Sequence, residues 1–336
     1  MTQTRAIARP IVHIGFHKTA TSWFQAAVYP HATSHRYVDR RLVRDTLLGG
    51  TAFEFDAVAT RAALGGDESR PPLVCEEDLS GTLHIGLASG YVAKGVAERI
   101  AAALPEAEIV IFVRAQPSAA LSWYVQYLRE GGTASASAYL FPQTHRHIGH
   151  GRPFMVPRFD FSQIDYRGLI ETYDRLFGSR NVHVYAYEAF AADRRGTIER
   201  MGRDLGLELG AVDFDSRPRN DSYRSALLPF VRAANLLTSR GAPGKRALVH
   251  LPYWYAGRKE LLKQVNRFSL FGRRPTPEGL LGRRTLDWIA QRFAANNRWL
   301  AERMDLDLKS LGYPLEPPAV PAELPAPPRW WRWTRN

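Results

Sequence analysis

A short apolar run that stops abruptly constrains the fold of this chain more than any other feature. Residues 11–15 (IVHIG) are typical of a buried strand, and Lys18 and several hydroxyl-bearing residues follow directly. The pattern predicts a strand, an anion-binding loop and the start of a helix. A helix N-terminus offers unpaired N–H groups and the positive end of the helix dipole, so an oxyanion binds there. The residues expected around that anion are His17, Lys18, Thr19, Ala20, Thr21, Ser22 and Trp23.

This loop differs from the Walker A loop of nucleoside triphosphatases. A Walker A loop has four residues between its glycines and a lysine directly after the second glycine. Here Lys18 follows Gly15 by only three positions. The spacing therefore indicates a more compact phosphate-binding loop.

A second apolar, β-rich run ends at a charged residue about a hundred residues later. Residues 109–113 are followed by Arg114, and Pro117 suits the first turn of a new helix. Ser122 stands eight residues after Arg114, with the aromatic residues Trp123 and Tyr124 behind it. This stretch predicts a second strand-to-helix junction that can bind a phosphate.

Together, in this order, the two stretches resemble the motifs of sulfotransferases that use 3′-phosphoadenosine 5′-phosphosulfate (PAPS), including bacterial members. The first resembles the 5′-phosphosulfate loop, and the second resembles the 3′-phosphate-binding motif. The resemblance covers most of residues 9–315 in element order, although its diagnostic residues are few. It implies one α/β domain over residues 9–315 with three layers. In this P-loop NTPase-like sulfotransferase fold, a mostly parallel central sheet is flanked by helices.

The resemblance also implies how a donor is held. Lys18 would stabilise the bridging oxygen that departs with the phosphate, while Thr21 and Ser22 would hold the 5′-phosphate. Arg114 and Ser122 would hold the 3′-phosphate, for which the guanidinium fork is well shaped. PAPS would be the donor and PAP the product, with no metal required.

Three further positions bear on the donor. In the family, a Trp at the place of Trp23 stacks on adenine, a contact of roughly 1–3 kcal/mol by analogy with base stacking; core packing is the alternative. Ala20 stands where the family usually has Gly. A positive φ would strain Ala there, so either the loop is helical at Ala20 or the phosphate sits slightly differently. Tyr187 and Glu188 resemble a Tyr-Glu pair of the family whose Tyr contacts the donor. The alternative for Tyr187 is packing in the core.

Carboxylates follow a third short apolar strand, residues 73–75. The strand runs directly into Glu76, Glu77 and Asp78, and the carboxyl ends of parallel strands face the ligand crevice of open α/β sheets. In many bacterial and glycan-modifying sulfotransferases, a Glu at such a strand end is the catalytic base. Strand register favours Glu77, with Glu76 as the fallback, because adjacent residues point opposite ways. Alternatively, one carboxylate caps the next helix and the other is solvated.

The positive charge of the chain is concentrated in one region. The formal net charge is +12, and residues 217–284 hold fifteen Lys or Arg against three acids, so the remainder is neutral. Such a field attracts anionic ligands. We expect the basic helical region 216–284 to serve the anionic donor, an acidic acceptor or both, with a solvated Arg-rich surface as the alternative. Candidates for clamping the 3′-phosphate or the acceptor are Arg273, Arg274, Arg283 and Arg284.

Two other segments lack helical or strand periodicity. Residues 131–160 are rich in Gly, Ser and His and are expected to form a lid or loop at the acceptor site. Their His145, His147 and His150 lack acidic or Cys partners, which favours solvent or acceptor contact over zinc binding. Residues 316–336 are Pro-rich and then Trp/Arg-rich, which indicates an extended tail that contacts a membrane interface or packs on the body.

Composition bounds the remaining possibilities. The single Cys75 excludes an intramolecular disulfide and a Cys-rich zinc site. Residues 1–10 lack the apolar segment of a secretory signal, and no run approaches the roughly 18 apolar residues of a membrane span, so cytoplasmic residence is expected. The sequence predicts sulfuryl transfer to a hydroxyl, on a carbohydrate before a phenol or another small natural product. The rival functions are a P-loop kinase or NTPase and a non-catalytic anion or nucleic-acid binder, although no nucleic-acid partner is expected.

Overall fold

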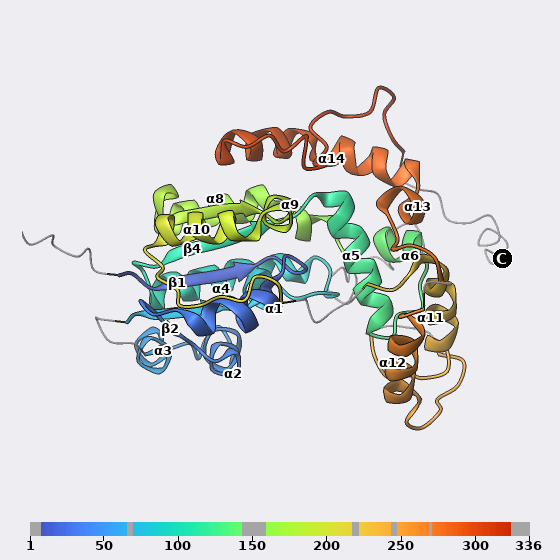
Figure 1. Ribbon diagram of the computed structural model, residues 1–336, viewed down its shortest axis with the longest axis horizontal. Coiled ribbons are helices and arrows are strands. Elements are labelled where there is room, and N and C mark those ends of the chain that lie inside the picture. The colour runs from blue at the N-terminus through green and yellow to red at the C-terminus, as the bar shows by residue number, and fades with distance from the viewer. Residues whose placement is uncertain are drawn as a thin grey trace, which may run out of the picture.

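The core of the molecule is a five-stranded parallel sheet with the strand order β2-β3-β1-β4-β5 (Figure 1). The computed structural model describes residues 8–65, 70–142, 159–216, 222–242, 247–268 and 271–323. Because β1 pairs with β3 on one side and β4 on the other, the carboxyl ends of these three strands adjoin. The strands are β1 (Ile11–Gly15), β2 (Arg36–Tyr37), β3 (Pro72–Cys75), β4 (Glu108–Val113) and β5 (Val182–Ala186).

Alternating apolar residues give the sheet two buried faces, as the period of a strand requires. In β4, Ile109 and Ile111 belong to one core cluster, while Val110 and Phe112 belong to the other. The first cluster includes buried residues of α4 (Ala88–Ala103), α8 (Tyr166–Phe177) and α14 (Arg283–Met304). The second includes residues of α10 (Arg194–Leu205) and of the helical stretch after β1. The expected three-layer α/β architecture with a parallel sheet is confirmed.

The strand-to-helix junctions follow the sequence pattern closely. The helical stretch after β1 consists of α1 (Thr21–Trp23), the π-helical η1 (Phe24–Val28) and the 3₁₀ turn η2 (Tyr29–His31), so it ends near Pro30 as expected. After β4, α5 (Gln116–Arg129) has Pro117 in its first turn. After β5, α9 (Tyr187–Ala192) begins at Tyr187.

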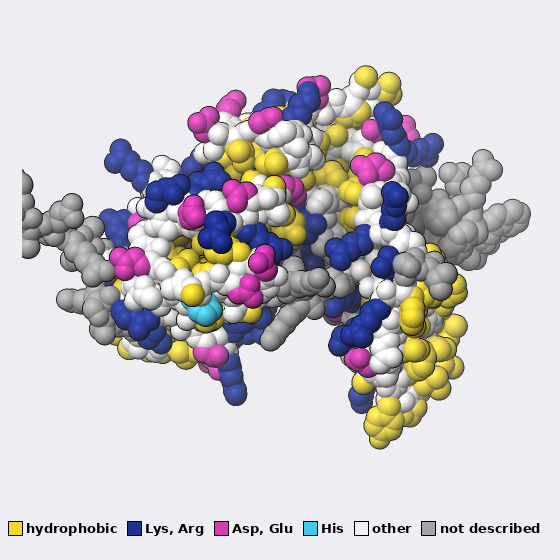
Figure 2. Space-filling model, viewed as in Figure 1, with side chains coloured by type: hydrophobic (Ala, Val, Ile, Leu, Met, Phe, Trp, Pro, Cys, Tyr) yellow, Lys and Arg dark blue, Asp and Glu magenta, His cyan; other side chains and the backbone are white. Residues whose placement is uncertain are grey.

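A second group of helices lies beyond the C-terminal half of α5 (Figure 1). It contains α6 (Ala136–Leu140), α11 (Leu228–Asn235), α12 (Trp254–Val265) and α13 (Pro277–Leu281). The side-chain amide of Asn235 ties α11 to this half of α5, because it donates to the carbonyl of Leu128 at 2.9 Å and to that of Gly132 at 2.5 Å. Figure 2 shows Lys and Arg side chains on the side of this group that faces the sheet and hydrophobic side chains on its outer side.

The shorter elements connect these layers. They are α2 (Arg40–Val43), η3 (Arg44–Leu48), α3 (Ala57–Leu64), η4 (Glu77–Ser80), η6 (Phe161–Ile164), η7 (Ser179–Asn181) and η8 (Ser225–Leu227). The polar stretch up to residue 70 thus holds β2 as well as the helical patches expected there.

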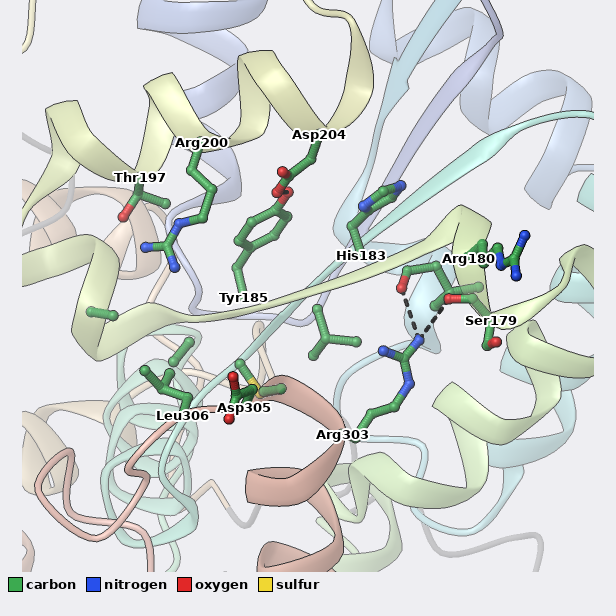
Figure 3. A pocket seen from close by; sticks show the side chains of 15 residues that line it. Ser179, Arg180, His183, Tyr185, Thr197, Arg200, Asp204, Arg303, Asp305 and Leu306 are labelled. Carbon is green, nitrogen blue, oxygen red and sulfur yellow. Dashed lines mark hydrogen bonds between the residues drawn. The ribbon is translucent and has the colours of Figure 1, made fainter.

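Strand β5 forms one edge of the sheet, and Arg303 covers part of it. Its guanidinium donates to the carbonyl oxygens of Ser179 at 2.9 Å and Val182 at 3.0 Å, beside a cavity of about 300 Å³ (Figure 3). Asp174 pairs with the same nitrogen at 3.2 Å. An edge strand exposes unpaired backbone groups that can pair with another chain, and Arg303 occupies one such group at the start of β5.

Two expectations fall outside the described residues. The central part of the expected lid, with His145, His147 and His150, is among them, and so are residues 324–336 of the expected tail. Within the described part of the chain, no helix is both long enough and apolar enough to cross a membrane.

Candidate functional site

The loop after β1 has an unusual backbone. Lys18 and Ala20 adopt positive φ angles of 65° and 70°, a conformation that costs a residue with a Cβ roughly 1–2 kcal/mol. The expected alternative of a helical Ala20 is therefore wrong, and the Ala is strained. The loop is held by the Phe16 N–H, which donates to the Phe112 carbonyl at 3.0 Å, and by the buried Thr19 hydroxyl, which donates to the Phe16 carbonyl.

The first helical turn after this loop leaves a hydroxyl without a partner. Oγ1 of Thr21 is buried and has no hydrogen-bond partner among the described residues. Ala20 caps the turn without a side-chain hydrogen bond, and Ser22 is exposed. An unpaired buried hydroxyl costs about 1–3 kcal/mol, so this position is suited to a bound anion.

Arg114 joins the two predicted motifs. Its Nη1 donates to the carbonyl oxygen of Lys18 at 2.9 Å, and its Nε donates to Oγ of Ser118 at 2.6 Å. The guanidinium also lies over the ring of Tyr187, 4.5 Å from the ring centre. The structure therefore brings together Lys18, Arg114 and Tyr187. Ser118 was not predicted, although it lies one helical turn before the predicted Ser122 and on the same face of α5.

The turn that carries Arg114 is fixed from both sides. The Ala115 N–H donates to Oε1 of Glu188 at 3.1 Å, and the Tyr166 hydroxyl donates to the Arg114 carbonyl at 2.5 Å. Tyr313 donates to the other oxygen of Glu188 at 3.2 Å, and burial raises the pKa of Glu188. Glu188 therefore positions the Arg114 turn.

Lys18 is buried among charges of both signs. Burial, together with the positive charges of Arg129 and Arg114, lowers the pKa of Lys18 to about 8, although Glu77 and Glu130 oppose the shift. A lysine with such a pKa remains mostly protonated at neutral pH. It therefore supplies a positive charge that little water screens.

A polar network extends from the Lys18 side chain. Nζ of Lys18 lies 3.4 Å from Oε1 of Gln126, whose Nε2 donates to Glu130 at 2.6 Å. Glu130 pairs with Nε2 of His84 at 2.9 Å, and Nδ1 of His84 meets the Tyr139 hydroxyl at 3.1 Å. This network orients the ammonium group, and no motif in the sequence indicated it.

Glu77 lies next to the end of β1. A Cβ at Gly15 would approach Cα of Glu77 to 3.2 Å, so the glycine allows this close contact. One oxygen of Glu77 accepts from Arg40 at 3.2 Å, whereas Oε2 is buried without a hydrogen-bond partner in the described part of the chain. Because its charge raises the pKa of Lys18, Glu77 lies within the field of that ammonium. Glu77 thus has one carboxylate oxygen that accepts no hydrogen bond from the described residues.

Glu76 has a different environment. Its side chain is fully buried and accepts hydrogen bonds from Arg40 at 2.8 and 2.9 Å and from Arg44 at 2.8 and 3.3 Å. Burial alone would raise the pKa of Glu76, but these bonds and charges outweigh it and lower the pKa. Glu76 also accepts from the Asp78 N–H and so caps η4. This matches the capping alternative considered for one of the two carboxylates.

Two other predicted residues are engaged by the protein itself. His17 is buried, and its Nε2 donates to the Gly81 carbonyl at 2.7 Å. Trp23 is only 5% exposed; its Nε1 donates to Oγ of Ser216 at 2.8 Å, and Arg194 lies 5.4 Å from the ring centre. This environment favours the packing alternative for Trp23, and adenine stacking stays a prediction.

Among the described residues, no group of three or more His, Cys, Asp or Glu side chains could hold a metal ion. Arg283, proposed as a phosphate clamp, is 92% exposed and lies 3.6 Å from Asp287. Its clamping role stays a prediction.

Comparisons with known proteins give matches among solved structures only. No family model matches the chain, and no curated protein sequence matches it. Among solved structures, the chain is similar to a sulfotransferase from Alicyclobacillus acidocaldarius, with a TM-score of 0.46 and 18% sequence identity. The match covers 79% of this chain and 99% of that one. Any statement on function must therefore come from the residues of the site.

Proposed function

We propose that the protein transfers a sulfuryl group from PAPS to an acceptor hydroxyl, with a carbohydrate as the favoured acceptor. One observation carries the proposal: Lys18, Arg114 and Glu77 follow three adjoining strands, and Arg114 is hydrogen bonded to the Lys18 backbone. A nucleotide with a phosphate near each end needs two anion-binding groups this close together. The resemblance in sequence assigns the same two motifs to the two phosphates.

The donor would be held by groups that are suited to anions. The unpartnered Thr21 hydroxyl and the N–H groups at the start of the helical stretch fit the 5′-phosphate. The Arg114 fork, with Ser118 and Ser122 on one face of α5, fits the 3′-phosphate. Tyr187 backs the guanidinium and limits its freedom.

The chemistry follows from Lys18 and Glu77. As the acceptor oxygen bonds to sulfur, the Glu77 carboxylate accepts the hydroxyl proton. The bond between sulfur and the bridging phosphate oxygen breaks, and its electron pair stays on that oxygen. The protonated Lys18 neutralises the growing charge, and a fixed cation of this kind is usually the largest contribution to the rate.

Glu77 is the better candidate for the base. It has an oxygen without a partner, whereas both oxygens of Glu76 accept hydrogen bonds from arginines. A carboxylate held by two guanidinium groups is a weak base, because these charges stabilise its ionised form. Glu76 instead holds Arg40, which in turn orients Glu77.

The test is transfer of labelled sulfuryl from PAPS to a panel of glycans and phenols without added metal, run beside ATP turnover with Mg²⁺. We expect labelled product from PAPS and no turnover of ATP. ATP turnover without sulfuryl transfer would replace the proposal with a kinase or NTPase. Tight, strongly salt-dependent binding of DNA or RNA without any binding of PAP would replace it with a nucleic-acid binder.

A further inference from the structure

A second cavity, of about 630 Å³, opens beside the end of the Lys18 network. It lies between the C-terminal half of α5, residues 222–224, α12 and Arg274. We call it the basic pocket. Its lining contains six cationic side chains, which are Arg129, Arg224, Lys259, Lys263, Arg267 and Arg274.

The two acidic residues of the lining leave most of this charge in place. Glu130 already pairs with His84 and Gln126, at 2.9 and 2.6 Å. Glu260 lies 3.7 Å from Lys263, and both side chains are more than half exposed, so the pair is weak. The basic pocket therefore has a positive potential.

One arginine behind the lining, Arg258, adds to that potential, and Arg224 of the lining keeps its charge. Arg258 is fully buried, and its hydrogen bonds go to the side-chain oxygen of Asn235 and the carbonyl oxygen of Arg129. Arg224 donates to the carbonyl oxygens of Asn266 at 3.0 Å and Gly272 at 2.6 Å. All of these acceptors are neutral, so they hold the guanidinium groups in place without cancelling their charge.

The basic pocket adjoins the side-chain end of Lys18, whereas Arg114 is bonded to the Lys18 backbone. The Lys18 backbone contacts Arg114 before the start of α5, whereas Nζ reaches Gln126, which lines the pocket. From Gln116 to Gln126, α5 advances ~15 Å at 1.5 Å per residue. Groups bound near Arg114 and groups bound in the basic pocket are therefore on opposite sides of the Lys18 ammonium.

We infer that the basic pocket binds an anionic substituent of the acceptor, such as a carboxylate or a sulfate, and that the acceptor is an acidic carbohydrate. The inference rests on the proposed function, since it places the acceptor hydroxyl near Lys18 and Glu77. A phenol needs a mainly apolar pocket, and Tyr223 is the one aromatic side chain among the described residues of this lining. Cations on two helices and on the loops beside them match an acceptor with several anionic groups.

Binding of matched oligosaccharides to the full chain, measured by fluorescence anisotropy without donor, tests the inference. The first pair of probes is octagalacturonate and its methyl ester, and the second is sulfated and unsulfated maltoheptaose. The test variant is K259Q/K263Q/R267Q. The control variant, R41Q/K94Q/K309Q, removes as many exposed charges, each of which lies near an exposed acid.

We expect the polyanions to bind about tenfold or more tightly than their neutral partners, and the test variant to lose that preference while the control keeps it. Preference for one polyanion over the other distinguishes a carboxylate subsite from a sulfate subsite. Equal binding of charged and neutral probes, or unchanged binding by the test variant, would overturn the inference. So would a loss of PAP affinity in the test variant, because the pocket would then serve the donor.

A wild-type protein that binds the polyanions but transfers no sulfuryl group would contradict the proposed function and leave the pocket assignment standing.

Discussion

Arg114 donates a hydrogen bond of 2.9 Å to the carbonyl oxygen of Lys18, 96 residues away in the sequence. The same guanidinium bonds Ser118 and lies over Tyr187. Arg114 therefore supplies a charge and also supports a loop in which Lys18 and Ala20 have positive φ angles. Any change at Arg114 alters the position of the Lys18 loop as well as the local charge.

Replacement of Arg114 by Lys should lower the affinity for PAP by about tenfold or more. A lysine keeps the charge but lacks the planar fork that bonds two partners while lying on an aromatic ring. Isothermal titration with PAP measures the effect, and the exposed Arg175→Lys serves as the control. Unchanged PAP affinity in Arg114→Lys would show that this residue does not bind the donor.

Glu77→Gln should reduce turnover by about a hundredfold or more, because an amide cannot take the acceptor proton. Affinity for PAP should stay nearly the same, since Glu77 is assigned to the acceptor. Single-turnover transfer from PAPS and titration with PAP separate the two effects. Full activity in Glu77→Gln would move the base to another residue.

The neighbouring Glu76→Gln should act on stability instead. It leaves Arg40 and Arg44 beside a neutral buried group, and because these arginines are 33% and 48% exposed, the cost should be below the about 3–5 kcal/mol of a fully buried pair. Thermal unfolding of both variants gives the comparison, in which Glu76→Gln should have a clearly lower Tm than Glu77→Gln. Equal Tm values would contradict the roles assigned to the two carboxylates.

The pH dependence of the reaction should report the ionisation of Lys18. The pKa of Lys18 is lowered to about 8, so the cation is present below this pH and is lost above it. Without bound donor, kcat/KM should therefore fall about tenfold per pH unit above pH 8. Lys18→Arg should remove this fall, because a guanidinium stays protonated. A flat profile in the native protein up to pH 10 would contradict the role of Lys18.

The buried His13 side chain should make the stability of the folded protein depend on pH. Burial lowers the pKa of His13 to about 3, below its ordinary 6.5, so the unfolded chain binds the proton more readily and stability falls as pH drops below 6.5. The slope from this residue is up to about 1.4 kcal/mol per pH unit between these two values. His13→Gln, which can still bond Tyr29 but does not titrate, should lose this part of the slope in urea unfolding at several pH values. An unchanged slope would mean that His13 takes up no proton on unfolding.

Sequence reasoning succeeded where local chemistry decides the structure. The ends of β1 and β4, the first turn of α5 at Pro117, and the end of α8 before Gly178 all follow from residues a few positions apart. The partners of the site residues could not be found in this way. Arg40, which bonds Glu76, lies 36 residues earlier in the sequence. The strand that precedes it, β2, has only two residues, so it leaves little pattern in the sequence. Glu130 and His84 meet only because α5 packs beside the loop after η4, and nothing in their spacing encodes that contact.

Ala20 offers a test of the loop that depends on no assumed activity. Its φ of 70° and ψ of 14° are left-handed, where Gly is unstrained and Ala is not. Ala20→Gly should therefore stabilise the protein by up to about 1 kcal/mol, once the larger unfolded-state entropy of Gly is subtracted from the relieved strain. Ala26→Gly is the matched control, because Ala26 is exposed inside the helical η1 and should lose roughly 0.5–1 kcal/mol on the same change. Chemical denaturation of the two variants measures both differences, and a lower stability of Ala20→Gly than of the native protein would mean that the loop after β1 is not left-handed at this residue.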